Sequence, residues 1–115
     1  MNTIRIIIAT VASLLLGTAL LTAGPGYIPS RDYTGVITDS MCGGDHAKMQ
    51  IAPDARCVQE CVMNGAKYAL HAGQNVYIMS DQKGASKFAA QKVTIDGNLN
   101  KKNNVMTVLS IHKAN

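Results

Sequence analysis

Apolar and polar residues alternate along five short runs of this chain, with the period of two that is typical of β-strands. Each run contains β-branched or aromatic residues and is bounded by turn-forming residues. The predicted strands are residues 33–38, 68–71, 76–79, 92–99 and 105–112. In the last strand the alternation predicts that residues 105, 107, 109 and 111 share one face. The pattern indicates a mainly β protein.

A helical spacing interrupts the strands between residues 55 and 66. Val58, Cys61 and Val62 recur at intervals of three and four residues along one face. Asp54 is suited to cap the start of this helix, and Gly65 lies where a helix would end. Residues 39–53 are predicted as a loop, and residues 85–90 as a short helical or irregular connector.

Five strands and one helix predict a small five-stranded OB-like barrel, because closure removes the exposed edges of a short antiparallel sheet. An open α+β sheet with one packed helix is the alternative. The predicted domain spans residues 33–115 and carries a Cys/His loop–helix insertion after its first strand. Residues 24–32, rich in glycine and proline, are predicted as an extended lead-in.

The N-terminal residues 1–23 have the three parts of a secretory signal peptide. A short basic start is followed by the apolar run 6–21 and by small residues, which predicts cleavage after Ala23. A retained membrane anchor is the alternative, but the apolar run is shorter than the roughly 20 residues that a spanning helix needs. We therefore expect a periplasmic or secreted protein without a stable membrane anchor after cleavage.

Charge and aromatic content argue against a nucleic-acid-binding protein. The net charge is +4, but the lysines and arginines are scattered along the chain. With one Phe and no Trp, the chain has few aromatic rings on which bases could stack. The expected partners are a metal ion or another protein chain.

One cluster of residues has the composition of a metal-binding site. Cys42, His46, Cys57 and Cys61 have the spacing C-x3-H-x10-C-x3-C, and the chain has no other cysteine. Cys57 and Cys61 are four residues apart, so on a helix they project from the same face. Together with Cys42 and His46 they would complete a tetrahedral site for zinc, or for copper as Cu(I).

A disulfide is the alternative interpretation of the same cluster. In an exported protein of this size, Cys42 would pair with Cys57 or with Cys61 and stabilise the fold by about 2–4 kcal/mol. Pairing of Cys57 with Cys61 is disfavoured by the geometry of an intact helix. One thiol would remain, and the protein would be a disulfide-stapled module that binds a ligand or a protein, or a subunit of an assembly.

Four segments of the chain resemble segments of known protein families. Residues 34–43, 57–62 and 65–70, with the motif DSxCG…CxxxC, resemble a family of short exported bacterial domains of unknown function. Residues 92–97 are similar to the fourth strand of small periplasmic OB-fold proteins. The resemblance implies a fold and export, but no reaction.

Nothing in the sequence predicts an enzyme. No nucleophile can be paired with a general base, and the adjacent Asp39 and Ser40 are better explained as a loop cap than as a catalytic pair.

Overall fold

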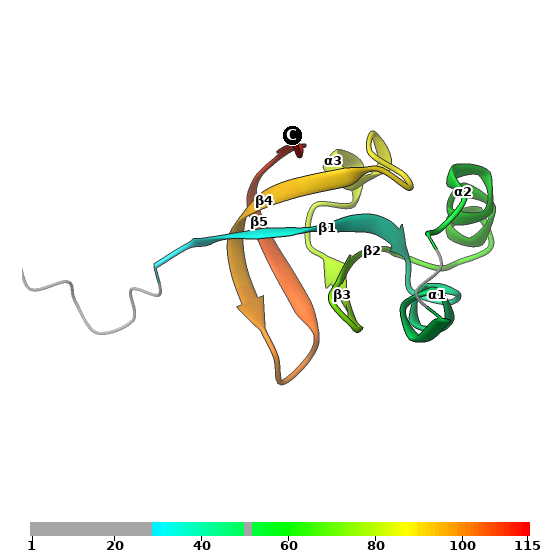
Figure 1. Cartoon of the computed structure of the whole chain (residues 1–115), viewed down its shortest axis with the longest axis horizontal. Helices are drawn as coiled ribbons and strands as arrows, with labels where there is room; N and C mark the ends of the chain where they lie inside the picture. Colours follow the sequence, from blue (N-terminus) through cyan, green and yellow to red (C-terminus); the bar gives the residue numbers. More distant parts are fainter. Residues whose placement is uncertain (1–28, 50–51) are drawn as a thin grey trace, which may run out of the picture.

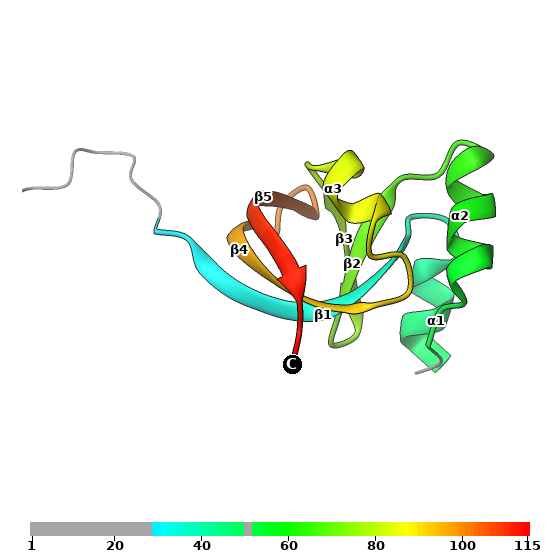
Figure 2. The same ribbon diagram turned by 90° about the horizontal axis from the view of Figure 1, so that it is seen from above.

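The computed structural model describes residues 29–49 and 52–115. The predicted signal peptide, residues 1–23, and most of the predicted lead-in lie outside the described residues. The strands are β1 Arg31–Asp39, β2 Tyr68–Ala72, β3 Asn75–Met79, β4 Lys92–Asn100 and β5 Val105–Lys113. The helices are α1 Gly43–Met49, α2 Ala55–Met63 and α3 Gln82–Ser86. Figures 1 and 2 show α1 and α2 together at one end of the molecule, away from the β4–β5 hairpin.

The five strands close into a ring in the order β1-β2-β3-β5-β4. Neighbouring strands are antiparallel except for β3 and β5, which pair in parallel, and β1 pairs with β4 to close the ring. The ring leaves no free edge along most of its circumference, which is how a short sheet avoids edge-to-edge association. The predicted OB-like barrel is confirmed, and the open α+β sheet is excluded.

The core lies inside this ring. It is built from alternate residues of all five strands, together with Val58 from α2 and two alanines from the α3 region. The largest side chains with essentially no exposed surface include Ile37, Leu70, Met79, Ile95 and Met106. The inner positions recur every second residue, as the period-two pattern in the sequence predicts for strands of a barrel.

The prediction of a single helix is wrong, because the described residues form three. The segment predicted as a loop contains α1, which follows directly on Cys42. Gly43 and Gly44 give this segment poor helix propensity, so packing must hold it. A Cβ at Gly43 would lie 2.9 Å from Thr38 Cγ2, so glycine lets α1 lie close against β1. Ala47 is buried on the same helix.

The predicted faces of the last strand also need correction. The register between β4 and β5 shifts so that Leu109 has no partner opposite it, which is the pattern of a β-bulge. Leu109 is 63% exposed, whereas Met106, Val108 and Ile111 contribute to the core. One extra residue reverses the alternation, so Ile111 shares the inner face with Met106 instead of the face of Val105.

Candidate metal centre

Helix α2 presents two of the three thiols. Its start is capped by Asp54, whose Oδ1 accepts hydrogen bonds from the backbone N–H of Arg56 (2.9 Å) and Cys57 (3.2 Å). Val58 is fully buried and fixes the inner face of the helix. Cys57 and Cys61 lie on successive turns beside it and are half-buried. The predicted cap and the shared face of the two cysteines are therefore confirmed.

The third thiol comes from the turn between β1 and α1. Asp39 is fully buried, and its Oδ1 accepts hydrogen bonds from the backbone N–H of Met41 (2.9 Å) and Cys42 (2.7 Å). Two further bonds join this turn to Lys67, which lies between α2 and β2: Ser40 N–H donates to the Lys67 carbonyl (2.8 Å), and Lys67 N–H donates to Ser40 Oγ (2.9 Å). Two hydrogen bonds thus fix Cys42 within the turn, and two more tie the turn to the connection between α2 and β2.

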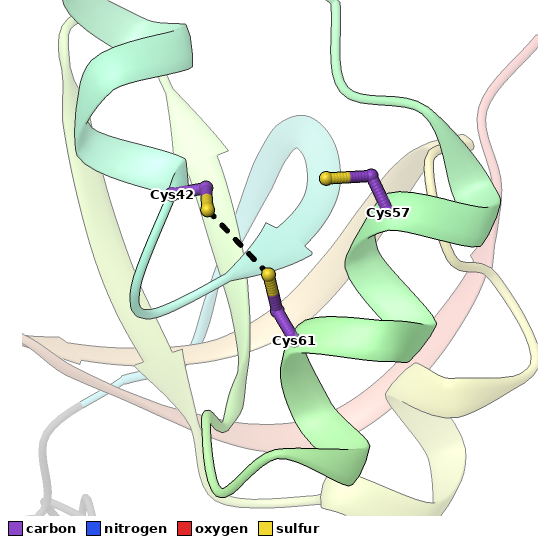
Figure 3. Close-up of side chains that lie close together, drawn as sticks. All are labelled: Cys42, Cys57 and Cys61. Atoms are coloured by element: carbon purple, nitrogen blue, oxygen red, sulfur yellow. Dashed lines mark hydrogen bonds between the residues drawn. The ribbon is translucent and has the colours of Figure 1, made fainter.

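These two elements bring the three sulfurs together. The Sγ atoms of Cys42, Cys57 and Cys61 all lie within 4.8 Å of one another. Figure 3 shows the three side chains pointing into a common space between the start of α1 and the face of α2. The shortest separation is 3.4 Å, between Cys42 and Cys61, which is a thiol–thiol hydrogen bond and not a covalent bond of about 2.05 Å. No pair of cysteines in the structure is at disulfide distance.

The donor set suits a soft metal ion. Zinc–sulfur bonds of about 2.3 Å place the sulfurs of a tetrahedral site about 3.8 Å apart. The Cys42–Cys61 separation of 3.4 Å is close to this value and none of the three separations exceeds 4.8 Å, so shifts of about 1 Å would fit the three thiols around one ion. Thiolates bind zinc and Cu(I) in preference to hard cations. The three cysteines can therefore hold a metal ion.

Protons compete for the same sulfurs. The pKa of the Cys61 thiol is raised from 9.0 to about 12, chiefly by its hydrogen bond with Cys42 and then by desolvation. The nearby Asp39 carboxylate raises the pKa further, because negative charge disfavours a thiolate. A thiol must lose its proton to become a ligand, so Cys61 stays protonated at neutral pH until a metal ion replaces the proton.

His46 does not join the group of three sulfurs. It lies on α1, where its backbone N–H donates to the Cys42 carbonyl (3.1 Å), and its imidazole lies outside the 4.8 Å group. Its Nδ1 atom is nevertheless buried and has no hydrogen-bond partner within the described part of the chain. A buried imidazole nitrogen without a hydrogen-bond partner is able to coordinate a metal ion.

Asp39 is the residue whose importance the sequence did not reveal. Its capping role was predicted, and the hydrogen bonds to Met41 and Cys42 confirm it. Its complete burial was not predicted, because a carboxylate is rarely found inside a small domain. The only signal was its position, three residues before a cysteine at the end of an apolar strand.

Comparison with protein-family models, with curated proteins and with solved structures gave no match. None of the helices in residues 29–49 and 52–115 has the length and apolar character required to cross a membrane.

Proposed function

We propose that this chain is an exported, non-catalytic domain that binds a soft transition metal ion, zinc or copper. The ligands are Cys42, Cys57 and Cys61, with His46 as the candidate fourth. The observation that carries the proposal is the convergence of three sulfurs, from a turn and a helix, within 4.8 Å. The export signal of residues 1–23 supplies the proposed periplasmic or secreted address.

Two roles for the metal follow from two ligand sets. With His46, the set becomes Cys3His, a closed site of the kind that stabilises a fold. Without His46, three half-buried thiolates leave an open position at which an ion can be exchanged, as a carrier requires. His46→Asn separates the two: for a closed site we expect a weaker metal complex, and for an open site an unchanged one.

The direct test is metal content. We expect reduced mature protein, purified without chelator, to retain one zinc or copper ion per chain by elemental analysis. Cys57→Ser and Cys61→Ser should each lower metal affinity by at least about tenfold. Met63→Leu is the matched control, because it replaces an exposed sulfur on the same helix (79% exposed). Protein that takes up neither metal, with the same melting temperature before and after chelation, would contradict the proposal.

A second candidate is a disulfide-stapled module that binds a ligand or another protein chain. It is favoured by the 3.4 Å contact, which makes Cys42 and Cys61 the pair closest to bonding. Oxidation would remove one proton and one electron from each thiol and pass them to an external disulfide, which becomes two thiols. Cys57 would remain free and available to link two copies of the chain in an assembly.

Mass spectrometry distinguishes the two candidates. A stapled protein has an intact mass two hydrogens below that of the reduced chain, accepts one alkyl group, and yields a peptide that joins Cys42 to Cys61. Non-reducing gels would reveal a dimer joined through Cys57. Three alkylated thiols after metal removal, with no cross-linked peptide, would reject the stapled module and support the metal site.

A further inference from the structure

A hollow lies at the other end of the molecule from the cysteines. It has a volume of about 710 Å³ and is bounded by the N-terminal half of β1 and by the β4–β5 hairpin. Figure 1 shows these segments on the side of the barrel opposite α1 and α2. The volume falls within the range of about 300–1,000 Å³ that is usual for small-molecule sites.

The floor of this hollow is apolar. Tyr33 pairs with Ile95 across the β1–β4 ladder, and Ile95 is fully buried, so Tyr33 lies on the inner face of the barrel. Both Tyr33 and Leu99 pack against the core from partly exposed positions. A ring and an aliphatic side chain therefore both contribute apolar surface to the hollow.

All the charged residues that line the hollow are basic. They are Arg31, Lys101 and Lys102. Asp32 and Asp96, the carboxylates nearest in the ladder, pair with each other on the alternate face and do not line the hollow. None of the three cations has a salt-bridge partner among the described residues. Three unpaired cations around an apolar floor complement an anionic group on an apolar or ring-shaped body.

The two lysines are held by an ordered turn. Lys102 N–H donates to Asn100 Oδ1 (3.0 Å), and Val105 N–H donates to Asn103 Oδ1 (3.2 Å). The turn is also tied to the barrel, because Ile78 N–H of β3 donates to the Asn104 carbonyl (2.8 Å). The backbone positions of both cations are thus fixed before a ligand arrives, which lowers the entropy cost of binding.

From these features we infer that the hollow is a binding site for a small anionic ligand, a phosphate or carboxylate carried on a body of sugar to nucleotide size. Arg31, Lys101 and Lys102 bind the anion, and its body rests on Tyr33 and Leu99. The site is separate from the proposed metal centre.

The test is an NMR titration of the mature protein with four probes: glucose 6-phosphate, glucuronate, inorganic phosphate and glucose. We expect saturable shifts of the amides of residues 31–33 and 98–102 with glucose 6-phosphate or glucuronate, and none with glucose. The organic anion should bind more tightly than inorganic phosphate, because only the organic anion covers the apolar floor. The two organic probes distinguish a phosphate from a carboxylate ligand.

Charge variants show whether the two lysines contact the anion directly or attract it only at long range. K101Q/K102Q should weaken binding by about tenfold, since it removes two contacts to a charged group. K83Q/K87Q is the matched control, with the same loss of charge at exposed positions around α3, and should change affinity less than about twofold.

Three results would overturn the inference. One is the absence of saturable shifts at millimolar probe. Another is equal weakening in both double variants, which would mean only long-range attraction. The third is equal affinity for inorganic phosphate and both organic anions, which would mean that the apolar floor takes no part.

Discussion

The barrel and the α1–α2 insertion are stabilised by different means. The barrel buries large apolar side chains from every strand, including Ile37, Leu70 and Ile95. Among the described residues of the insertion, Val58 is the one large aliphatic side chain that is completely buried, and hydrogen bonds to the backbone contribute much of the remaining order. The thiol groups lie in this second region, where few apolar contacts hold the chain.

This difference predicts how each region responds to change. A barrel stabilised by buried area loses stability when a large core residue is shortened, whichever part of the core it occupies. An insertion held by hydrogen bonds loses order when one hydrogen-bond acceptor is removed. It gains stability when a metal ion binds residues from both of its segments. Variants in the two regions should therefore separate the stability of the fold from the properties of the thiols.

The largest expected effect is from Leu70→Ala. Leu70 is fully buried, and the substitution should lower the free energy of unfolding by about 2–5 kcal/mol, measured as a lower midpoint in urea with an unchanged slope. The metal stoichiometry of the folded fraction should not change. If this variant does not fold, Ile95→Val, with an expected loss of about 0.5–1.5 kcal/mol, provides the same comparison. A lower metal stoichiometry in folded protein would show that the two regions are not independent.

Gly97→Ala should have the next largest effect. A Cβ at this position would overlap the backbone carbonyl oxygen of Thr107, which cannot move without disturbing the bulge. We expect a loss of about 1–3 kcal/mol in thermal or urea unfolding. Gly44→Ala in α1 is the control, because its Cβ would meet no atom within 4 Å and should stabilise the helix by about 0.5–1 kcal/mol. Equal effects from the two substitutions would contradict this account.

The barrel could be predicted from the sequence because its strands alternate with period two and are separated by turn-forming residues. The bulge at Leu109 could not, because the extra residue is defined by its partner strand and not by its own run. Helix α1 was missed for a related reason: its glycine pair argues against a helix, and packing of Gly43 against Thr38 and Val76, with burial of Ala47, overcomes this propensity.

The candidate site was predictable in part. The spacing of Cys57 and Cys61 places both on one helix face, and this holds whatever surrounds the helix. The approach of Cys42 to α2 depends on the hydrogen bonds between Ser40 and Lys67, two residues far apart in sequence, which no local pattern encodes. The position of His46 depends on α1, so an error in that helix became an error in locating its imidazole.

Asp39 provides the test of directed bonding in the insertion. Asp39→Ala removes the acceptor for the N–H groups of Met41 and Cys42, and should lower metal affinity by about 10–100-fold in competition with a chromophoric chelator. Asp39→Asn keeps an acceptor oxygen and should lose less. Asp81→Ala is the control: it removes the cap of α3, a helix that carries none of the thiols, and should leave metal affinity unchanged. If both alanine variants bind metal as the wild type does, Cys42 is not positioned by Asp39.

The smallest expected effect is on the reactivity of Cys61 in the reduced, metal-free protein. Because its pKa is raised to about 12, less thiolate is present at pH 8 than in the unfolded chain, and alkylation of this thiol should be at least about tenfold slower than in urea. The same shift in pKa makes the stability of the fold depend on pH. The protonated thiol favours the folded state below pH 9.0, and this contribution is lost as the pH rises from 9.0 towards 12.

Peptide-level mass spectrometry would measure this rate at each cysteine between pH 7 and pH 9. Cys42→Ala removes the hydrogen bond that is the main cause of the raised pKa, so it should speed the labelling of Cys61 and move its pH dependence to lower pH. Labelling of Cys61 at the same rate in folded and unfolded wild-type protein would show that the contact with Cys42 does not hold its proton. The two thiols would then act separately, and the insertion would have one directed bond fewer than the structure indicates.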